Sequence, residues 1–414
     1  MKMRDMKPIV DAAKKMAYRA NTVVMDLATK AVPGMFPFPE EIFGRGCARN
    51  LPPVLNRYGV RRPLVVTGPT VGKLVVPPIL EDLQQAGIPY VVFDAVEENP
   101  SVKTVETIRA LYLSEQCDGF LCIGGGSPMD AGKAAAARVV RPDLPVTRMA
   151  GMMKILKKIP PLIAVPTTAG TGSEATIGAV ISDHDNHHKY AITDPCLMPA
   201  CAVLDPLLTL TVPQSVTAAT GMDVLTHAVE SYVTWAYNNN FTNRCAEEAT
   251  VKVFRYLEQV YADGSDIDAR EQMLIASYKA GLAFTRTGVG YVHAIAHAMG
   301  GLYNTPHGLA NAVILPIVLE DYGACVHPQL AHLAEITNVK TMGTDAEKAA
   351  AFIGAIRAMN KRMGLPTGFD FIRQEDYDKI IKWALDEANK TYPVPVVYNE
   401  ERCRHVLNRI VLEA

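Results

Sequence analysis

The sequence predicts two domains of different class, an α/β domain with a parallel sheet followed by a domain built only of helices. The chain of 414 residues is long enough to bury two sizeable cores. Short apolar runs alternate with helical segments up to about residue 210, and from Val212 onward only helical patterns follow. We therefore expect an α/β domain at residues 36–210, an α-helical domain at residues 211–414, and a helical extension at residues 1–35.

The extension is predicted to form one helix over residues 8–30. Its apolar residues recur at alternating steps of four and three, which gives one stripe along the helix. Pro33-Gly34 would end the helix. The stripe fits a helix packed on its own domain and a contact with another subunit equally well. It consists of Ile9, Ala13, Met16, Ala20, Val23 and Leu27.

Four short apolar runs in the next part of the chain are predicted to be buried strands. Segments around 73–87, 101–116 and 128–140 carry helical spacing between them. Strands separated by helices indicate a parallel sheet covered on both faces. The strand runs are residues 63–67, 90–93, 119–123 and 162–166, and the last strand-like run is 203–205. Breaks between the later helices are expected near Gly264, residues 288–290, Pro306 and Pro366.

Composition excludes several classes of partner. The net charge is −2, so no basic surplus suggests a nucleic-acid partner. Eight cysteines without a CxxC pair indicate buried, reduced thiols. No uninterrupted apolar run is long enough to span a bilayer, and the N-terminus lacks the apolar region of a signal peptide. We expect a cytoplasmic protein with no membrane partner.

One carboxylate and four histidines form a candidate metal site. Asp223 and His227 lie four residues apart, so on a helix both side chains share one face. His293 and His297 repeat the spacing, and His307 follows shortly after. A single histidine pair is more often structural, but two such pairs and a fifth polar residue favour a metal. One carboxylate and three imidazoles suit Fe²⁺, Zn²⁺ or another first-row divalent ion, and one histidine remains to act beside it.

Two segments of the first domain have the composition of ligand-binding loops. Gly124-Gly125-Gly126-Ser127 lies between a strand and a helix that opens at Pro128, with Ser127 as its cap. Backbone N–H groups there suit a pyrophosphate, although the run is neither GxGxxG nor a P-loop and a plain tight turn is the alternative. Residues 167–174 place hydroxyls and glycines directly after a strand, which favours ligand contact over a capped turn. Lys189 alone would be a surface lysine.

These motifs together resemble those of the iron-containing (group III) alcohol dehydrogenases. The matching segments are residues 124–127, 166–174, 219–228 and 293–308, and the resemblance runs from about Phe38 to the C-terminus. Residues 1–35 look like an addition to the usual family chain. The resemblance implies a Rossmann-like α/β domain, an α-helical domain and a cleft between them. This is the fold shared by the dehydroquinate synthases and the iron alcohol dehydrogenases.

The resemblance also implies roles for individual residues. The metal ligands would be Asp223, His227, His293 and His307, with His297 as the extra histidine near substrate and nicotinamide. Gly125, Gly126 and Ser127 match the pyrophosphate loop, and Asn99 matches an asparagine that approaches the cofactor. The positions that line the nicotinamide and its ribose would be Thr167, Thr168, Thr171 and Lys189.

The implied activity is that of a metal-dependent, NAD- or NADP-linked alcohol dehydrogenase or aldehyde reductase. Iron, or zinc or another divalent ion, would act as a Lewis acid on the oxygen of a small primary alcohol or aldehyde. The nicotinamide would exchange the hydride, and neutral His297 would pass the proton between substrate and solvent. We expect a homodimer or a larger homo-oligomer.

Two positions depart from the commonest family pattern. Gly68 follows the first predicted strand where many NAD-using members carry an aspartate, and the missing carboxylate would admit the 2′-phosphate of NADP. Arg286, two residues after Phe284, stands where many members carry asparagine. An arginine paired with a local carboxylate is one interpretation. The other is a substrate site, made by Phe284 and Arg286, for an anionic aldehyde with a sulfonate or carboxylate group.

Three other functions remain as alternatives. A lyase like dehydroquinate synthase also couples NAD to a metal, but it usually uses one carboxylate and two histidines. A metal-dependent hydrolase would need a carboxylate base, for which Glu230 lies one turn from His227. A non-catalytic binding protein is the third alternative.

Overall fold

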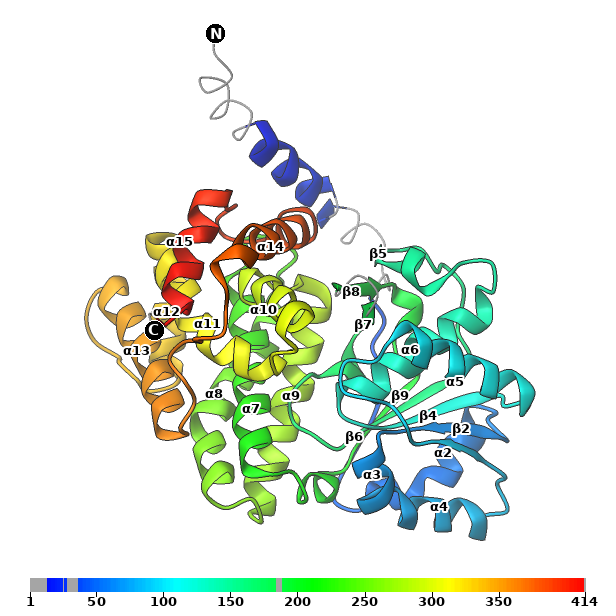
Figure 1. The fold of residues 1–414 in the computed structure, drawn as a ribbon. Helices are drawn as coiled ribbons and strands as arrows, with labels where there is room; N and C mark the ends of the chain where they lie inside the picture. Colours follow the sequence, from blue (N-terminus) through cyan, green and yellow to red (C-terminus); the bar gives the residue numbers. More distant parts are fainter. Residues whose placement is uncertain (1–12, 25, 28–35, 184–187, 413–414) are drawn as a thin grey trace.

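The computed structural model describes residues 13–24, 26–27, 36–183 and 188–412. Figure 1 shows a domain containing a sheet beside a domain of packed helices, with the N-terminal helix above the helical domain. The two-domain fold predicted from the sequence, with a parallel sheet followed by helices, is confirmed.

The main sheet has six strands, and every pair of neighbours in it is parallel. All four strand runs predicted between residues 63 and 166 are present. A first edge strand was missed because its Glu40-Glu41 pair gives no apolar run, and its residues alternate between exposed and half-buried. The order is β1 (Glu40–Phe43), β9 (Cys201–Leu204), β6 (Leu162–Pro166), β4 (Gly119–Gly124), β2 (Pro63–Val66) and β3 (Val91–Phe93).

Helices cover both faces of this sheet, as the apolar strands require. In β4, Phe120 and Cys122 join the core shared with α5 (Val102–Ser114) and α6 (Gly126–Val140). Leu121 and Ile123 face the opposite core. Helix α6 lies close to the sheet because a Cβ at Gly132 would come 2.2 Å from Cys122 Sγ. The helices of the opposite face are α2 (Leu51–Arg57) and α4 (Val76–Gln85), with α3 (Pro69–Leu74) before α4.

The start of α6 differs from the sequence prediction. The helix begins at Gly126, and Gly125 is the N-cap residue, without a side-chain cap. Ser127 therefore lies inside the first turn, and its predicted capping role is wrong. The glycine run itself takes up the turn from β4 into the helix, so the helix starts before the serine.

A second sheet, of three strands, belongs to the first domain and lines part of the cavity described below. Strand β7 (Gly178–Asp183) pairs antiparallel with β8 (His188–Thr193), which pairs in parallel with β5 (Gly151–Met152). Residues 184–187, which connect β7 and β8, lie outside the described residues. The two strands themselves were not predicted, because β8, His-Lys-Tyr-Ala-Ile-Thr, mixes polar and apolar residues.

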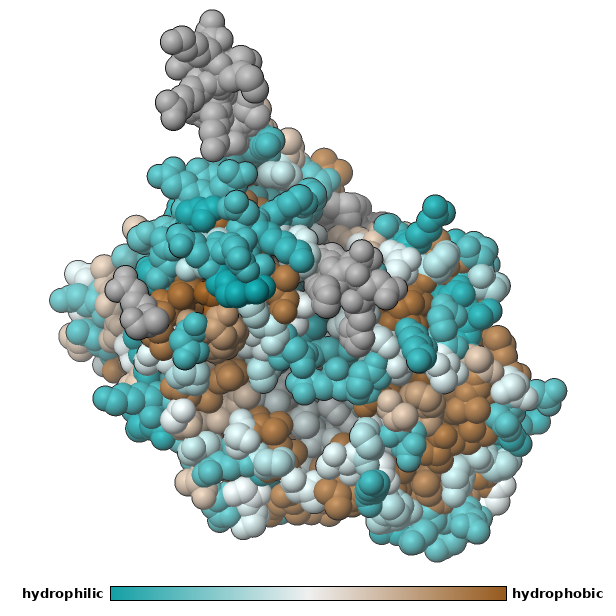
Figure 2. All heavy atoms as spheres, in the orientation of Figure 1, coloured by the Kyte–Doolittle hydropathy of each residue, from teal (hydrophilic) through white to brown (hydrophobic). Residues whose placement is uncertain are grey.

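Long helices form the second domain, and most residues of its central helices α7 and α11 are buried. We propose residues 36–210 and 211–414 as domain limits, since β9 ends at Leu204 and α7 begins at Gln214. On the face drawn in Figure 2, hydrophilic and hydrophobic residues intermingle over both domains. The helices are α7 (Gln214–Val233), α8 (Asn240–Ala262), α9 (Ile267–Thr287), α10 (Tyr291–Tyr303), α11 (His307–Tyr322), α12 (His327–Ile336), α13 (Asp345–Arg362), α14 (Tyr377–Thr391) and α15 (Glu400–Ile410).

One helical stretch is apolar enough to be compared with a membrane span. Residues His307–Ile336 reach a mean hydropathy of 1.5, and the stretch is long enough to cross a membrane. The expectation that no stretch is long enough to span a bilayer therefore holds only for uninterrupted apolar runs. Of the most apolar window, 67% is buried inside the protein. That burial is typical of a core helix in a globular domain, because a helix that is apolar on all sides must be surrounded by other elements.

The N-terminal helix contacts the helical domain through a face other than its apolar stripe. Residues 13–24 and 26–27 are helical, whereas Ile9, Pro33 and Gly34 lie outside the described residues. Within the apolar stripe, the exposed fraction is 73% for Met16 and 61% for Leu27. The stripe therefore does not hold the helix on its own domain. The contacts come from the neighbouring face, with Tyr18, Arg19 and Asp26.

Candidate metal and cofactor site

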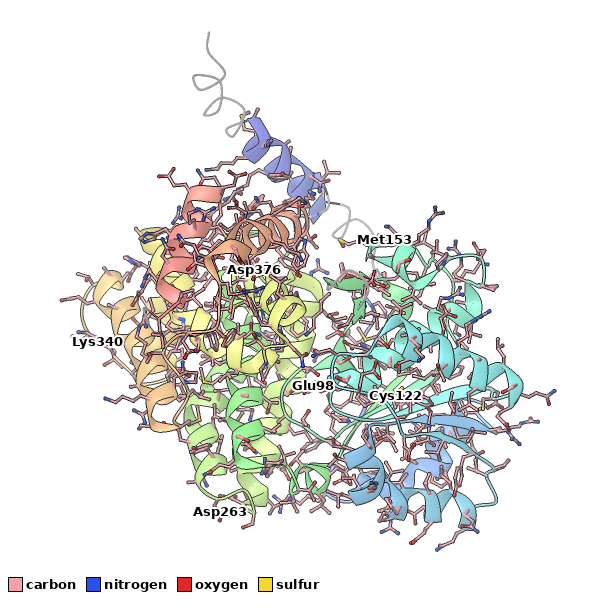
Figure 3. The ribbon with its side chains drawn as sticks, in the orientation of Figure 1. Glu98, Cys122, Met153, Asp263, Lys340 and Asp376 are labelled. Atoms are coloured by element: carbon pink, nitrogen blue, oxygen red, sulfur yellow. The ribbon has the colours of Figure 1, made fainter. Side chains whose placement is uncertain are left out.

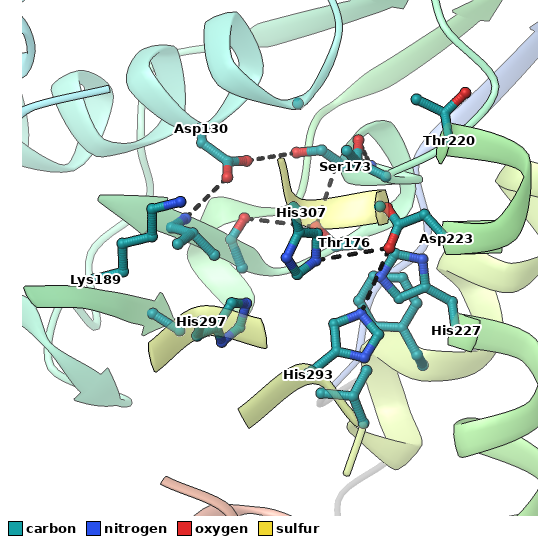
Figure 4. Close-up of a pocket in the computed structure, with 18 of the residues that line it drawn as sticks. Asp130, Ser173, Thr176, Lys189, Thr220, Asp223, His227, His293, His297 and His307 are labelled. Carbon is teal, nitrogen blue, oxygen red and sulfur yellow. Dashed lines mark hydrogen bonds and ion pairs between the residues drawn. The ribbon is translucent and has the colours of Figure 1, made fainter. Parts of the chain in front are cut away.

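Four of the five residues in the predicted metal cluster bring their ligand atoms together. Asp223 and His227 come from α7, His293 from α10 and His307 from α11, and one ligand atom of each lies within 4.8 Å of the other three. Asp223 Oδ1 is 3.8 Å from His293 Nε2 and 3.6 Å from His307 Nε2. A tetrahedral site with ligands at ~2.1 Å has edges of about 3.4 Å, so the donor set fits a small divalent ion with slight adjustment. Figure 4 shows the cluster.

Close contact between helices makes this convergence possible. Helix α11 begins beside α7, where a Cβ on Gly308 would lie 2.3 Å from the backbone oxygen of Ala219. The residue after His307 must therefore be glycine for α11 to approach α7. Asp223 lies one turn along α7 from Ala219, which places its carboxylate level with the His307 ring.

Burial prepares the imidazoles for a metal. Asp223, His227 and His293 are buried. Burial lowers the pKa of His227, and it lowers the pKa of His293 well below the usual value. Both rings are therefore neutral at physiological pH, and neutral imidazole is the form that binds metals.

Asn311 belongs to this cluster, and the sequence analysis missed it. Its amide nitrogen donates to Asp223 Oδ1 at 2.7 Å and lies 3.2 Å from His293 Nε2 and 3.1 Å from His307 Nε2. Its position four residues after His307 on the same helix was the available signal. The amide holds the carboxylate in place among the imidazoles.

Glu230 orients one of the candidate ligands. Its Oε2 accepts from His293 Nδ1 at 2.5 Å, and its Oε1 accepts from the backbone N–H of Val292 at 2.9 Å. With Nδ1 bonded to the carboxylate, His293 presents Nε2 to the cluster, and a carboxylate behind a ligating histidine is a recurrent support for metal sites.

His297 is set apart from the four converging side chains, as Figure 4 shows. Its Nδ1 lies 2.8 Å from Glu387 Oε1, and the hydroxyl of Tyr392 donates to the same oxygen at 2.6 Å. Its ring stacks on that of His307, with centroids 5.1 Å apart. Glu387 and Tyr392 belong to α14 and the residue that follows it, about ninety positions along the chain, and no local pattern marked them.

A cavity of about 780 Å³ lies over this cluster, with walls from both domains. Its size is within the range of sites for a cofactor and a small substrate. Figure 3 places Glu98, another lining residue, on the side of the first domain that faces the helices. Of the residues selected from the sequence, those that line the cavity are Asn99, Gly126, Ser127, Thr171, Lys189, Asp223, His227, Phe284, Arg286, His293, His297 and His307.

Asn99 connects the two domains at the cofactor side of the cavity. Its side-chain oxygen accepts from Lys189 Nζ at 2.6 Å, and its amide nitrogen donates to Asn304 Oδ1 at 3.0 Å. Its backbone N–H donates to Ser127 Oγ at 3.4 Å. Lys189 is buried, and burial lowers its pKa to about 8. Lys189 is thus a buried hydrogen-bond donor rather than a surface lysine.

The other predicted cofactor residues follow the carboxyl ends of adjacent parallel strands, the usual position of nucleotide sites in such sheets. Gly125 follows β4 and Gly68 follows β2. Neither is among the described residues that line the cavity. Thr167 and Thr168, after β6, line a smaller hollow of about 110 Å³, which adjoins the large one because Val216 lines both.

Lys133 and Asp130 support the loop that carries part of the cavity wall. Lys133 is buried, and its Nζ donates to the backbone oxygens of Ser173 at 2.7 Å and Gly178 at 2.9 Å. Asp130 accepts from Ser173 Oγ at 2.8 Å and from the backbone N–H of Val180. This role of Lys133 was not predicted from the sequence, because its partners lie about forty residues further along the chain.

The two candidate substrate residues lie on α9 next to the metal cluster. The Phe284 ring stacks on His227, with centroids 4.2 Å apart. Arg286 donates from Nε to the backbone oxygen of Tyr237 at 3.1 Å, and its guanidinium lies 5.6 Å from the centre of the Phe36 ring. Among the described residues Arg286 forms no ion pair, so its interpretation as the partner of a local carboxylate finds no support there.

Comparison with known proteins agrees with this architecture. Residues 39–206 match the family "Iron-containing alcohol dehydrogenase", and residues 217–411 match the C-terminal domain of the same family. The chain belongs to the iron-containing alcohol dehydrogenases. It is 39% identical over 318 residues to 1,3-propanediol dehydrogenase of Klebsiella pneumoniae. The aligned region covers 75% of this chain and 80% of that protein.

Two solved structures have a similar fold over nearly their whole length. The first, a 1,3-propanediol oxidoreductase, has a TM-score of 0.85 at 34% identity and covers 91% of this chain and 99% of that one. The second is the sulfoacetaldehyde reductase of Bifidobacterium kashiwanohense in complex with NAD⁺. Its TM-score is 0.79 at 27% identity, over 91% of this chain and 98% of that one.

Proposed function

We propose that this family member is a metal-dependent, nicotinamide-linked alcohol dehydrogenase or aldehyde reductase acting on a small primary alcohol or aldehyde. The observation that carries the proposal is the convergence of Asp223, His227, His293 and His307 in one cavity with Ser127 and Lys189. A divalent ion and a nicotinamide bound there would supply a Lewis acid for the substrate oxygen and a hydride acceptor or donor.

The protein's own residues would bind the ion and the cofactor, orient the metal ligands and transfer a proton. Asp223 and the three histidines would hold the ion, with Glu230 and Asn311 fixing the orientation of the ligands. Lys189, Asn99 and Ser127 offer polar atoms on the cofactor side. His297 is placed to exchange the substrate's proton, since its Nδ1 is held by Glu387 and its ring borders the cavity.

The alternative of a metal-dependent hydrolase is disfavoured by the position of Glu230. Both of its carboxylate oxygens are engaged, one by His293 and the other by the backbone of Val292. A general base needs a free oxygen within reach of a water molecule. A lyase of the dehydroquinate synthase type is disfavoured by the third histidine of the cluster.

NAD is the cofactor named for the sulfoacetaldehyde reductase structure, and we propose that Gly68 lets this enzyme use NADP as well. Gly68→Asp is expected to shift the ratio of kcat/KM for the two cofactors toward NAD, because a carboxylate repels the 2′-phosphate and bonds the ribose hydroxyls. Steady-state kinetics with both cofactors measures the ratio.

A matched control is needed because a Cβ at position 68 would lie 3.1 Å from the backbone oxygen of Val96. Gly68→Ala introduces this contact without the charge. An equal ratio in Gly68→Ala and Gly68→Asp would show that the adenosine ribose is recognised elsewhere.

We further propose an anionic substrate, such as an aldehyde with a sulfonate or carboxylate group, bound by Arg286. The guanidinium at the cavity wall, which forms no ion pair with any of the described residues, supports this, as does the fold shared with a sulfoacetaldehyde reductase. Arg286→Ala should lower kcat/KM for an anionic aldehyde about tenfold or more. A loss of this size corresponds to one charge-assisted hydrogen bond, which contributes about 1.5–3 kcal/mol.

Butanal is the neutral control substrate, and kcat/KM for butanal should change little in Arg286→Ala. Equal losses on butanal and on the anionic aldehyde would assign Arg286 a structural role, through its bond to Tyr237. The general test of the proposed function is a panel of neutral and anionic alcohols and aldehydes with NAD and NADP after anaerobic loading with Fe²⁺. Location in the cytoplasm and assembly into a homodimer or larger homo-oligomer stay predictions of the sequence.

A further inference from the structure

The N-terminal helix reaches the cavity that holds the candidate metal site. Asn21 and Thr22 of this helix line the cavity, and so does Phe36. All three precede residue 39, where the match to the family begins. The cavity wall thus contains side chains from a part of the chain that lies outside the family's shared sequence.

Polar contacts hold the helix in this position. Arg19 donates to the backbone oxygen of Pro395 at 2.7 Å, and its guanidinium lies 4.5 Å from the centre of the Trp235 ring. Asp26 Oδ1 accepts from the backbone N–H of Tyr237 at 3.2 Å. These contacts lie on both sides of Thr22 along the helix, so they fix its place at the cavity.

Cavity-lining residues connect the metal cluster to this helix. The His227 ring stacks on Phe284, and Arg286, two residues later on α9, lines the same cavity. Arg286 contacts Phe36 and the backbone oxygen of Tyr237, whose backbone N–H donates to Asp26 of the N-terminal helix. A substrate that binds its oxygen at the cluster would extend along Phe284 toward this wall.

We propose that Thr22 and Phe36 form the outer wall of the substrate end and limit the length of the aldehyde that the enzyme accepts. The inference rests on the proposed reductase activity and adds a specificity determinant to it. Short aldehydes end near Phe284 and do not reach the wall, whereas longer chains must pass Phe36 and Thr22. The discrimination therefore acts on chain length and leaves the reacting atoms unchanged.

The test compares reduction of ethanal and hexanal by Thr22→Trp. The indole would fill the outer cavity, so kcat/KM for hexanal should fall about tenfold or more while that for ethanal stays within about twofold, a range typical of steric discrimination in apolar pockets. The control is Met16→Trp, which adds the same side chain to the exposed face of the same helix. It should leave both substrates unchanged.

Two further variants distinguish a wall that limits substrate length from a general disturbance of the enzyme. Phe36→Ala enlarges the cavity and should raise the hexanal-to-ethanal ratio of kcat/KM. Adding Arg19→Ala and Asp26→Ala to Thr22→Trp removes the contacts that hold the helix and should relieve the block on hexanal.

The possible results have distinct meanings. A hexanal-to-ethanal ratio that stays constant in both Thr22→Trp and Phe36→Ala would overturn the proposed wall, even if the unsubstituted enzyme is active. Absence of any aldehyde reduction by the metal-loaded, unsubstituted enzyme would instead overturn the proposed reductase activity.

Discussion

His293→Ala is expected to abolish both metal binding and activity. The substitution removes one of four converging ligand atoms, and it leaves Glu230 buried without the imidazole that it orients. Loss of one ligand from such a site lowers metal affinity steeply and misplaces the remaining ligands. Elemental analysis of the purified variant after loading with Fe²⁺ measures the metal, and nicotinamide absorbance measures the activity.

His297→Ala is the matched control, since this histidine lies on the same helix face, four residues further along α10. It should retain the metal. A metal-free His297→Ala together with a metal-loaded His293→Ala would show that the ligand assignment is wrong.

The second large effect is expected on the rate of His297→Ala. With the proton-transfer group removed, kcat should fall by about 10²–10⁴-fold, the usual contribution of general acid–base catalysis. KM should change far less, because the metal and cofactor sites keep their residues. Steady-state kinetics on the metal-loaded variant gives both constants.

Glu387→Gln probes the same function from behind the histidine. It keeps the shape of the side chain but removes the charge that faces His297 Nδ1 and Tyr392. We expect a smaller loss of kcat than in His297→Ala, with metal content unchanged. If kcat of Glu387→Gln equals that of the unsubstituted enzyme, the carboxylate has no part in positioning the histidine.

The fold was predictable where strands are buried on both faces. Residues 119–123 and 162–166 are continuous apolar runs, and both are central strands of the sheet. Strand β1 lies at the edge and β8 lines the cavity through Lys189, so both carry polar residues that break an apolar pattern. Partial exposure at the sheet edge and a position in the cavity wall explain why these strands were not predicted.

Asp223 and His227 were visible as candidate ligands because they lie four residues apart on a helix. His293 was visible through the same spacing to His297, although His297 is not one of the four converging residues. Their supports were less visible. Asn311 lies four residues after His307 on the same helix, but a single asparagine at that spacing is a weak signal. Glu387 reaches His297 only through the packing of α14 against α10, so its role depends on tertiary structure. Thr22 reaches the cavity through a polar face of a helix whose apolar stripe drew attention instead.

Metal reconstitution tests the central claim most directly. Protein stripped with a chelator is titrated anaerobically with Fe²⁺, and reduction of NAD or NADP by a short primary alcohol is followed by absorbance. We predict no activity in the stripped protein and a rise that saturates at about one ion per chain, the capacity of the Asp223, His227, His293 and His307 cluster. Full activity in metal-free protein, or no nicotinamide reduction at any metal content, would contradict the account.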